Sequence, residues 1–540
     1  MESVSVDRLD HLGVVAAVIK DLGLIQMLDA RLCVHAQEEI TTGEAVAGMI
    51  LNGLGFSNRP WSFTPQLFAN TPLDLLFRQG VTAEMFNRFK LGRSLDEVHA
   101  YGCDLLLSEV AMAVCAHEGI DQRFNHLDTT RFSLTGDSMP ESDEHAIAIT
   151  HGYSKDHRAD LKQAVLELMV SQDGGVPLLS KSWDGNASDS KVFQERAEAL
   201  LKTLQNSPTP RYVVADCKLY DKDTAEHLKS LPFITRIPHT LQVVSQVITQ
   251  ALAIDTWHDV DAQTRYQRLE LCHYGMAQRW LVVFSQAAAW RAEAAVRQAQ
   301  HKEYDAIQQQ LFHLQAQRFE SQTSASEALS KLGKKWRYHH LDSYAFTAHK
   351  RYGTKGRPTP RTPIKATEWQ IEAQVLPEAK RLNHAKQLGA CYVIGSNIPC
   401  EQLSDVEVIT GYKAQAQAEG GFRFLKDPLF FVSSLFVKKP SRIQGLLMVM
   451  TLALLVYSVT PRRLRQALAR RNDTLPNQIH QPTRRPTLRW VFQLLEGMHR
   501  VRVTVQDQVH TLIEGLNEVR IKILRLFGEK VCQVYHIASG

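Results

Sequence analysis

The stretch RFNHLDTTRFSL, residues 123–134, decides the fold of this 540-residue chain. Its residues alternate as in a half-buried β-strand, which places Phe124, His126 and Asp128 on one face. Two further apolar stretches, QAVLELMVSQ and VPLLSKSW, follow it on either side of the glycine pair at positions 174 and 175. Glycines between two such stretches are typical of a β-hairpin, so the sequence predicts a strand followed by a hairpin.

The pattern continues towards the C-terminus with strands and helices in alternation. A helix is expected at 190–204, and RYVVAD is a short apolar strand that ends at Asp216. A second helix is expected from about Asp221, and FITRI, residues 233–237, is the next strand. This alternation predicts an α/β fold in which helices flank a mixed sheet.

Residues 1–115 are expected to form a helical N-terminal domain that binds DNA ends or dimerises. Thr41 and Glu44 form a capping box ahead of an apolar helix, and another helix is expected after Thr82. A third helix carries apolar residues at helical spacing, namely Leu105, Leu106, Val110 and Val114. A domain that only packs helices fits these patterns equally well, since no recognition helix can be identified.

The alternation is interrupted between 240 and 390, which we interpret as an insertion. It contains two paired strands, RYQRLELCHYG and QRWLVVFSQ, and then a long helical stretch at 290–332. The basic segment KRYGTKGRPTPRTPIK, residues 350–365, is rich in Pro and Gly and is expected to be an exposed loop. The core then resumes with the strand ACYVIGSN, so the predicted catalytic core comprises 116–239 and 391–460.

The composition, 44% hydrophobic and 22% charged, is that of a globular protein. The eight cysteines are scattered without a C-x-x-C pair, which argues against a zinc site and favours a reducing cytoplasm. The start of the chain has no secretory signal, and the apolar run at 446–459 is shorter than the roughly 20 residues of a membrane span. We therefore expect a cytoplasmic protein with a buried apolar helix at 443–459 and no membrane partner.

The positive charge is concentrated in the basic C-terminal region, 461–540, which is expected to be helical. The net charge of the chain is only +5, but ten arginines and no lysine lie between Pro461 and Arg502. A guanidinium can bind a phosphate through two parallel hydrogen bonds, so the cluster favours a polyanion. Six members are candidates for contacts with flanking DNA: Arg462, Arg463, Arg465, Arg484, Arg485 and Arg489. A solvated basic face is the alternative.

Three carboxylates are the candidate metal ligands. Asp128 lies on the first core strand and Asp216 at the carboxyl end of a later one. Neighbouring strand ends can share a hard divalent cation, although an aspartate at a strand end is also ordinary turn chemistry. The third, Glu419, has Tyr412, Gln415, Arg423 and Lys426 near it at helical spacing. On one continuous helix these residues would share a face, which is either a phosphate-binding surface or a solvated one.

These residues resemble the signature Y-x2-R-x3-E-x6-K of a large group of bacterial insertion-sequence DDE transposases, which have a ribonuclease-H-like core. Tyr412, Glu419 and Lys426 match the signature, and Gln415 stands where the family has Arg. The segments HLDTT, VVAD and AEGGFRFLKDPLF resemble the three catalytic motifs of the family. HGYSKDHRADLKQ and SWDGNASD resemble stretches between the first two acids, and the resemblance extends over about residues 10–500.

The resemblance implies a two-metal mechanism with Mg²⁺, for which Mn²⁺ can substitute. Asp128 would bridge both ions, while Asp216 and Glu419 would each favour one ion. Water would first cleave the DNA, and the freed 3′-hydroxyl would then attack target DNA. The implied partners are double-stranded DNA of the terminal inverted repeats, target DNA, and a second copy of the chain in the synapse, in a bacterial cytoplasm on the nucleoid.

The resemblance also implies DNA contacts by other residues. Besides those around Glu419, the candidates at the rim of the site are Lys155, His157, Arg158 and Lys162, with Asn186 as a supporting residue. Aromatic residues of the insertion stack on a flipped base in related enzymes, and the candidates are Trp257, Trp280, Trp290, Trp336 and Trp369. Each of these tryptophans could equally be a buried structural residue.

Two other functions fit the same acids. One is a ribonuclease-H-like nuclease that only hydrolyses DNA, which would need neither the insertion nor the terminal regions. The other is a domesticated transposase that binds DNA without catalysis, against which the intact acid triad argues.

Overall fold

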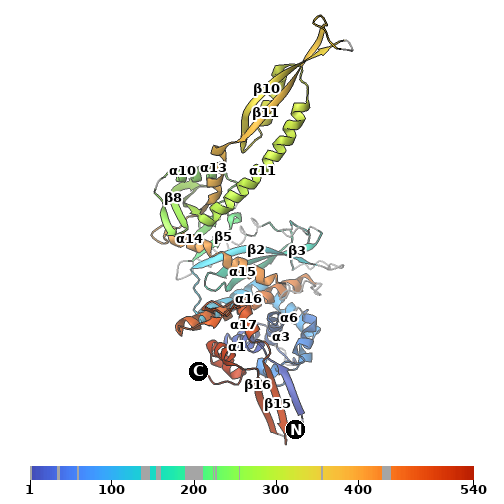
Figure 1. Ribbon diagram of the computed structural model, residues 1–540. Coiled ribbons are helices and arrows are strands. Elements are labelled where there is room, and N and C mark those ends of the chain that lie inside the picture. The colour runs from blue at the N-terminus through green and yellow to red at the C-terminus, as the bar shows by residue number, and fades with distance from the viewer. Residues whose placement is uncertain are drawn as a thin grey trace. The chain divides into compact units, whose positions relative to one another are not determined.

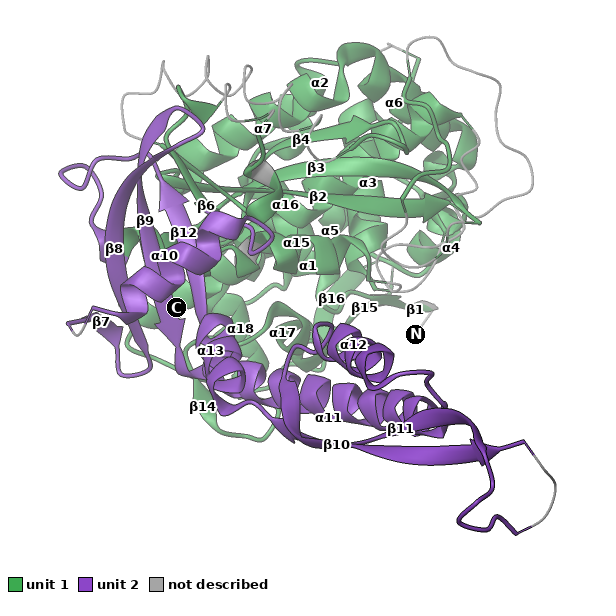
Figure 2. Cartoon of the chain, turned by 90° about the horizontal axis from the view of Figure 1, so that it is seen from above, with its two compact units in different colours: residues 1–235, 407–540 green, residues 236–406 purple. Residues whose placement is uncertain are grey.

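A computed structural model describes most of the chain. It covers residues 3–32, 37–56, 60–134, 146–153, 158, 160–188, 192, 211–222, 224, 228–254, 256–353, 357–427, 439–506 and 508–539. The chain forms two compact units, residues 1–235 with 407–540 (unit 1) and residues 236–406 (unit 2) (Figure 2). The helix expected at 190–204 and most of the one expected from Asp221 lie outside the described residues.

The helices of unit 1 come from both ends of the chain (Figure 1). The N-terminal ones are α1 (Leu12–Asp21), α2 (Leu24–Asp29), α3 (Thr42–Leu54), η1 (Trp61–Phe63), α4 (Thr64–Phe68), α5 (Leu73–Leu76), η2 (Ala83–Phe86), α6 (Arg88–Tyr101) and α7 (Cys103–Glu118). The others are η3 (Cys217–Leu219), α14 (Asp405–Lys413), α15 (Ala416–Leu425), α16 (Pro440–Arg470), α17 (Leu488–Leu494), α18 (Glu518–Phe527) and α19 (Glu529–Val534). The capping box predicted at Thr41 is confirmed, with Glu44 donating its amide to the Thr41 hydroxyl.

The principal strands of unit 1 lie in the order β4-β3-β2-β5-β6. Their bounds are β2 (Phe124–Leu134), β3 (Lys162–Ser171), β4 (Pro177–Trp183), β5 (Tyr212–Ala215) and β6 (Phe233–Arg236). Strand β3 is antiparallel to both β2 and β4, whereas β5 is parallel to both β2 and β6. This mixed order is that of a ribonuclease-H-like core, so the predicted α/β fold class is confirmed.

The two ends of the chain meet in a smaller sheet of order β1-β15-β16. The remaining strands of unit 1 are β1 (Ser3–Arg8), β13 (Leu475–Pro476), β14 (Pro482–Thr483), β15 (His499–Val505) and β16 (Gln508–Glu514). The C-terminal region expected to be helical therefore contains strands, and β15 pairs with β1 of the expected N-terminal domain. The boundary expected at 460 is also wrong, because it falls inside α16.

Helix α16 is the centre of unit 1. It contacts β4, α15 and helices from both termini: α1, α3, α6, α7, α17 and α18. By length and composition it could cross a membrane, but 89% of its most apolar window is buried inside the fold, as in the core helix of a soluble protein. The buried apolar helix predicted at 443–459 is confirmed, and it extends to Arg470.

Unit 2 combines a sheet with a long extension, which consists of helices and a two-stranded antiparallel ribbon formed by β10 and β11. Its elements are α10 (Gln242–Leu252), β7 (His258–Asp261), β8 (Thr264–His273), β9 (Met276–Ser285), α11 (Gln286–Ala316), α12 (Gln322–Gly333), β10 (His339–Tyr352), β11 (Ile364–Pro377), α13 (Ala379–Ala390) and β12 (Cys391–Ser396). The predicted pair β8 and β9 is confirmed, and β12 continues their sheet. The helical stretch expected at 290–332 is two helices separated by residues 317–321, and the loop expected at 350–365 includes the ends of β10 and β11.

The carboxylate of Glu303 fixes the point where the chain enters β10. It accepts hydrogen bonds from the amides of Arg337 and Tyr338, at 2.6 and 2.7 Å, and lies 2.8 Å from Nδ1 of His339. Burial by itself raises the pKa of Glu303, but these three partners outweigh it and hold the pKa below its usual value. Glu303 thus joins α11 to the base of the ribbon.

We expect Glu303→Gln to loosen this base, because a neutral amide cannot replace a carboxylate that accepts from three donors. The loss is about 1–3 kcal/mol, measured as faster hydrogen exchange at the start of β10 in the full chain. The pKa of Glu303 is lowered on folding, so its contribution is present above the carboxyl's unfolded pKa and is lost as pH falls through the folded pKa. Glu320→Gln, at an exposed position, is the control. Equal exchange in both variants would contradict this role.

Candidate active site

The register of two parallel strands sets Asp128 beside Asp216. β2 and β5 pair up to Leu127 and Ala215, and each aspartate is the residue that follows directly. Both aspartates are half-buried. Asp128, in the middle of β2, and Asp216, directly after β5, are therefore neighbours across the sheet, and a cation shared by their carboxylates stays a prediction.

Local hydrogen bonds hold the backbone around each aspartate. Asp216 caps the short helix η3, accepting from the Lys218 amide at 2.9 Å, while the Thr235 hydroxyl donates to its carbonyl at 2.8 Å. The Asp128 carboxylate accepts from the Thr129 amide at 2.7 Å. Thr235 lies on β6, so it ties the end of β5 to the next strand; the sequence shows it only as one residue of a short apolar strand.

Helix α15 covers the face of β2 that carries Asp128. Asp128 pairs across the hairpin with Leu168, and directly opposed residues of a sheet share a face. A Cβ built on Gly421 of α15 would lie 3.4 Å from the Leu168 side chain. Further along, the Lys426 ammonium lies 6.0 Å from the ring of Phe132, which is four residues beyond Asp128 on that face. Glu419 therefore belongs to the helix that packs next to Asp128.

The continuous helix expected from Tyr412 to Lys426 is interrupted. α14 ends at Lys413 and α15 begins at Ala416, and Gln415 lies in the turn between them. Tyr412 is half-buried on the first helix and Gln415 is 8% exposed, so these two do not continue the stripe of the second helix. Glu419 and Arg423 are exposed one turn apart on α15, and Lys426 is half-buried at its end. The expectation that Tyr412, Gln415, Glu419 and Lys426 share one face of a single helix is therefore wrong, because the helix is broken at the turn.

The three carboxylates are near one another in the fold but are not assembled into a metal cluster. Among the residues that the structure describes, no three His, Cys, Asp or Glu side chains are grouped to hold an ion. Asp128 and Asp216 nevertheless offer oxygen ligands at adjacent strand positions, which is the donor type that Mg²⁺ binds. The donor set fits a divalent cation, and Glu419 is the member that stands apart on the exposed side of α15.

His126 is a neighbour of the site for which sequence patterns indicate no role. It lies on the same face of β2 as Asp128 and is fully buried. Burial lowers its pKa to about 4, outweighing the opposite effect of Gln172. The imidazole is therefore neutral near pH 7, so His126 adds no positive charge beside the carboxylates.

The other predicted contact residues are less clearly connected to the aspartates. Lys155 and His157 lie outside the described residues. Arg158 is exposed and pairs with Asp160, at 2.8 Å. Lys162 opens β3 opposite Leu134, six residues along the strands from the Asp128 pair, or roughly 20 Å. Asn186 is exposed. Arg484, which donates to Asn472, and Arg485 are exposed on the surface of unit 1.

The arginine cluster is in large part structural, contrary to its interpretation as a phosphate-binding surface. Arg462 is 8% exposed and binds the Asp173 carboxylate at 2.6 and 2.9 Å and the Glu118 and Gly119 carbonyls. Arg463 pairs with Glu118 and Asp21. Burial raises the pKa of Asp173, but Arg462 and the Asp121 amide hold it below its usual value. Arg462 thus clamps α16 to the end of α7 and to the hairpin, and Arg463 clamps α16 to α7 and α1.

Arg489 and Arg465 are intermediate cases. Arg489 pairs with Asp427 at 3.0 Å and lies over the ring of Phe56. Burial lowers the pKa of Arg465, and the charge of Arg485 adds to this effect. Fewer of the six candidate arginines are therefore available to bind DNA than the sequence suggested. Binding by the others would require a buried ion pair to break.

We expect Arg462→Gln to destabilise unit 1 by about 3 kcal/mol, because removing one partner leaves Asp173 and two carbonyls without their donor. Urea unfolding measures the loss. Arg485→Gln, at an exposed position, is the matched control and should change the stability by less than about 0.5 kcal/mol. If the two variants were equally stable, the clamp assigned to Arg462 would be wrong.

The candidate stacking tryptophans of unit 2 differ in exposure. Trp280 is fully buried and Trp336 is 5% exposed within an apolar cluster, so both are core residues. Trp369 packs against the same cluster, and Arg265 covers Trp257. Trp290 is 62% exposed and alone among the five offers a free ring face for stacking in the described structure.

The order and directions of the strands define the class of the fold, a ribonuclease-H-like core that carries two neighbouring aspartates. Comparison with protein families makes this specific, since the transposase DDE domain matches residues 127–456. That is more than half of the chain, which therefore belongs to the DDE transposase family. A domain of unknown function, DUF4277, matches residues 4–112.

Comparison with functionally curated proteins finds no match. Among solved structures, the chain is similar to the cryo-EM structure of a piggyBac transposase synaptic complex with hairpin DNA. The identity is 9%, the TM-score is 0.24, and the match covers 50% of this chain and 57% of that chain. The similarity thus spans little more than half the length of that protein.

Proposed function

We propose that this protein is a transposase that cuts DNA at transposon ends and joins the ends to target DNA. The observation that carries the proposal is the register of β2 and β5, which places Asp128 and Asp216 side by side within a DDE transposase domain. We further propose that it belongs to the bacterial insertion-sequence group with the Y-x2-R-x3-E-x6-K signature and acts in the cytoplasm on the nucleoid.

Asp128 and Asp216 would hold divalent cations, Mg²⁺ or Mn²⁺, and Glu419 would complete the set. Two such ions supply an activated hydroxyl and stabilise the leaving 3′ oxygen during phosphodiester cleavage. The chain contributes the placement of the ligands: strand pairing fixes the two aspartates, and the packing of α15 on β3 fixes the helix of Glu419. Because Glu419 is exposed, its carboxylate is free to turn towards a DNA phosphate and its ions.

Arg423 and Lys426 would position the DNA end through its phosphates. Arg423 lies in the last turn of α15 and Lys426 is its C-cap, and cations placed there neutralise phosphates without reading the sequence. Tyr412 and Gln415 would contribute polar contacts from α14 and the turn. We propose the terminal inverted repeats, target DNA and a second copy of the chain as partners, with both DNA ends held in a synaptic dimer.

We expect Asp128→Asn and Asp216→Asn each to reduce Mg²⁺-dependent cleavage of transposon ends by more than about 100-fold. Loss of a residue that only hydrogen-bonds to a metal ligand typically costs about 10- to 100-fold, and loss of a ligand itself should cost more. The assay uses a plasmid that carries the DNA flanking the gene, and both variants should still bind this DNA. Unchanged cleavage by Asp128→Asn would refute the metal assignment. Cleavage without any joined product would indicate a nuclease, and binding without cleavage by the parent protein would indicate a domesticated DNA-binding protein.

We expect Lys426→Ala to weaken binding of transposon ends mainly at low salt. Removal of one cation from a phosphate reduces the slope of log Kobs against log salt by about 1. Lys331→Ala, at an exposed lysine of α12, is the control and should leave the slope unchanged. An unchanged slope in Lys426→Ala would assign this lysine to the packing against Phe132 instead.

A further inference from the structure

Unit 2 carries a two-stranded ribbon that the proposed chemistry does not use. β10 and β11 have 14 residues each and pair from His339 and Pro377 to Tyr352 and Ile364. At about 3.4 Å per residue, the ribbon is roughly 45 Å long. The structure describes no other strand that pairs with it. Phe319 bridges the edge of β11 at Trp369, and no described strand pairs with either edge between that bridge and the end of the ribbon.

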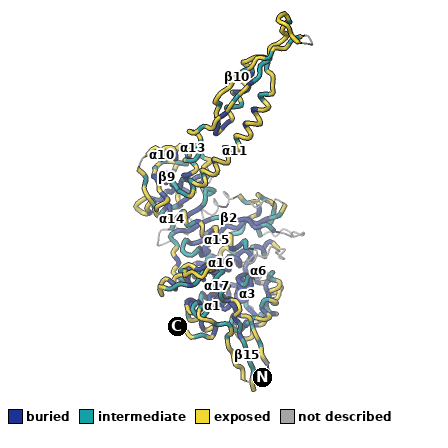
Figure 3. The backbone as a smooth tube through the Cα atoms, in the orientation of Figure 1, coloured by how far each residue is buried: buried dark blue, intermediate teal, exposed yellow. Residues whose placement is uncertain are grey.

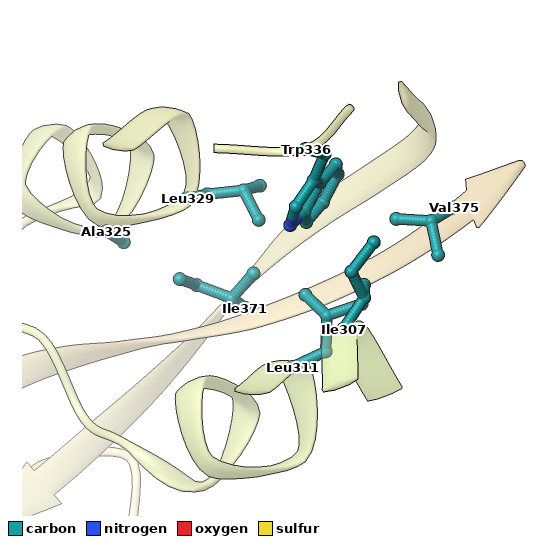
Figure 4. Packing of buried hydrophobic residues seen from close by; sticks show 7 residues of the cluster. All are labelled: Ile307, Leu311, Ala325, Leu329, Trp336, Ile371 and Val375. Atoms are coloured by element: carbon teal, nitrogen blue, oxygen red, sulfur yellow. The ribbon is translucent and has the colours of Figure 1, made fainter. Parts of the chain in front are cut away.

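The inner part of the ribbon is fixed by an apolar core on one face. Ile371 and Val375 of β11 pack with Ile307 and Leu311 of α11 (Figure 4). The same cluster contains Ala325 and Leu329 of α12 and the ring of Trp336. Phe346 and Trp369 extend it outwards on the same face. This half is held against helices and cannot swing freely.

The outer part of the ribbon has no such cover. On the face that packs inwards, the next cross-strand pairs are Lys350 with Thr367 and Tyr352 with Ile364. Lys350, Thr367 and Ile364 are exposed, and the last is 48% exposed. Figure 3 shows the tube of this end almost entirely in the colour of exposed residues. Nothing described in unit 2 therefore covers the tip, residues 350–353 and 357–365.

The tip is basic and free of carboxylates. Residues 343–367 contain no Asp or Glu, and their cations are Lys350, Arg351, Lys355, Arg357, Arg361 and Lys365. Five of the six are described, and all five are exposed. Arg351 pairs with Glu368 at 3.1 Å, and no ion pair is found for the other four within the described residues. Concentrating like charge on so small an element costs repulsion unless a polyanion neutralises it.

The tip is also stiff. Three prolines, at 358, 360 and 363, restrict the backbone. The Thr362 amide donates to the Thr359 carbonyl at 2.9 Å, and the Thr362 hydroxyl accepts from the Thr359 amide at 2.9 Å. A turn closed in this way loses less conformational entropy on binding than a flexible basic tail does.

We propose that the tip of the ribbon, residues 350–353 and 357–365, binds the backbone of duplex DNA. The inference rests on the proposed function, because a transposase needs surfaces for DNA beyond the reacting phosphate. A two-stranded ribbon fits the major groove of B-DNA, which is about 12 Å wide. Cations on both strands and on the turn would then reach phosphates on the two sides of the groove, and this contact would be independent of DNA sequence.

The test measures binding of the full chain to a labelled 30-bp duplex of arbitrary sequence, in EDTA so that no cleavage occurs. The tip variant carries Lys350→Gln, Arg351→Gln, Arg357→Gln, Arg361→Gln and Lys365→Gln. The control variant removes the same charge from exposed helical positions of unit 2, with Arg291→Gln, Lys302→Gln, Lys331→Gln, Lys334→Gln and Lys335→Gln. A third variant, Arg357→Glu with Arg361→Glu, changes only residues outside the strand ladder.

We expect the salt slope of the tip variant to fall by about 0.9 for each DNA phosphate that it no longer neutralises, and the affinity at 100 mM salt to fall at least tenfold. The third variant should show the same direction, which excludes unfolding of the ribbon as the cause, and the control should keep the slope of the parent. Equal weakening in the tip and control variants, or unchanged binding in both tip variants, would overturn the proposal. The proposal would also be overturned if the tip variant bound the duplex like the parent protein but no longer bound anionic lipid vesicles.

This result is separate from the test of the catalytic proposal. A tip variant that binds duplex DNA like the parent overturns only the role of the ribbon. Unchanged end cleavage by Asp128→Asn overturns only the metal assignment.

Discussion

Burial of α16 is the constraint on which unit 1 depends. Its apolar middle, residues 446–456, touches helices from both ends of the chain as well as β4 and α15. Burying apolar surface stabilises by roughly 25 cal/mol per Å², and this helix supplies a shared apolar surface for elements hundreds of residues apart. Arginines fix its ends: Arg442 binds Asp96 of α6 through two hydrogen bonds, and Arg462 binds Asp173 of the hairpin. Burial of apolar surface supplies the stabilising free energy, and the ion pairs fix the position of α16 relative to α6 and the hairpin.

The candidate active site follows from that position. A Cβ on Gly421 would lie 3.2 Å from Leu454 of α16 and 3.4 Å from Leu168 of β3, so α15 is held closely between them. The two aspartates depend instead on strand register, which hydrogen bonding specifies residue by residue. Two carboxylates are thus fixed by the sheet, whereas the third is carried by a packed helix and keeps an exposed side chain. In such a site the two aspartates are held rigidly, whereas the side chain of Glu419 can change its conformation.

Patterns with a short period were predicted well because local geometry produces them. The strand around Asp128, the glycine turn of the hairpin and the capping box at Thr41 each reflect contacts within a few residues, and all are present in the structure. The expected half-burial of that strand is wrong, because β2 is buried on both faces. The helix through Gln415 was predicted as continuous because its spacing is helical, but tertiary packing buries Gln415 and breaks the helix there. The ribbon was missed because the alternation of its outer half has no apolar side to reveal it.

The sequence by itself determined the succession of strands in the core, the position of Asp216 directly after β5 and the apolar middle of α16, because each is written in local periodicity. The tertiary structure placed Asp128 in the middle of β2 and extended the apolar helix from Pro440 to Arg470. Only the tertiary structure decided what the arginines do. A guanidinium has the same chemistry in a buried pair with Asp173 as on a phosphate, and the choice depends on which carboxylate the fold brings within reach. The fold likewise decided that Asp128, Asp216 and Glu419 form no group of metal ligands among the described residues, since the distance between a helix and a strand is set by packing and not by spacing along the chain.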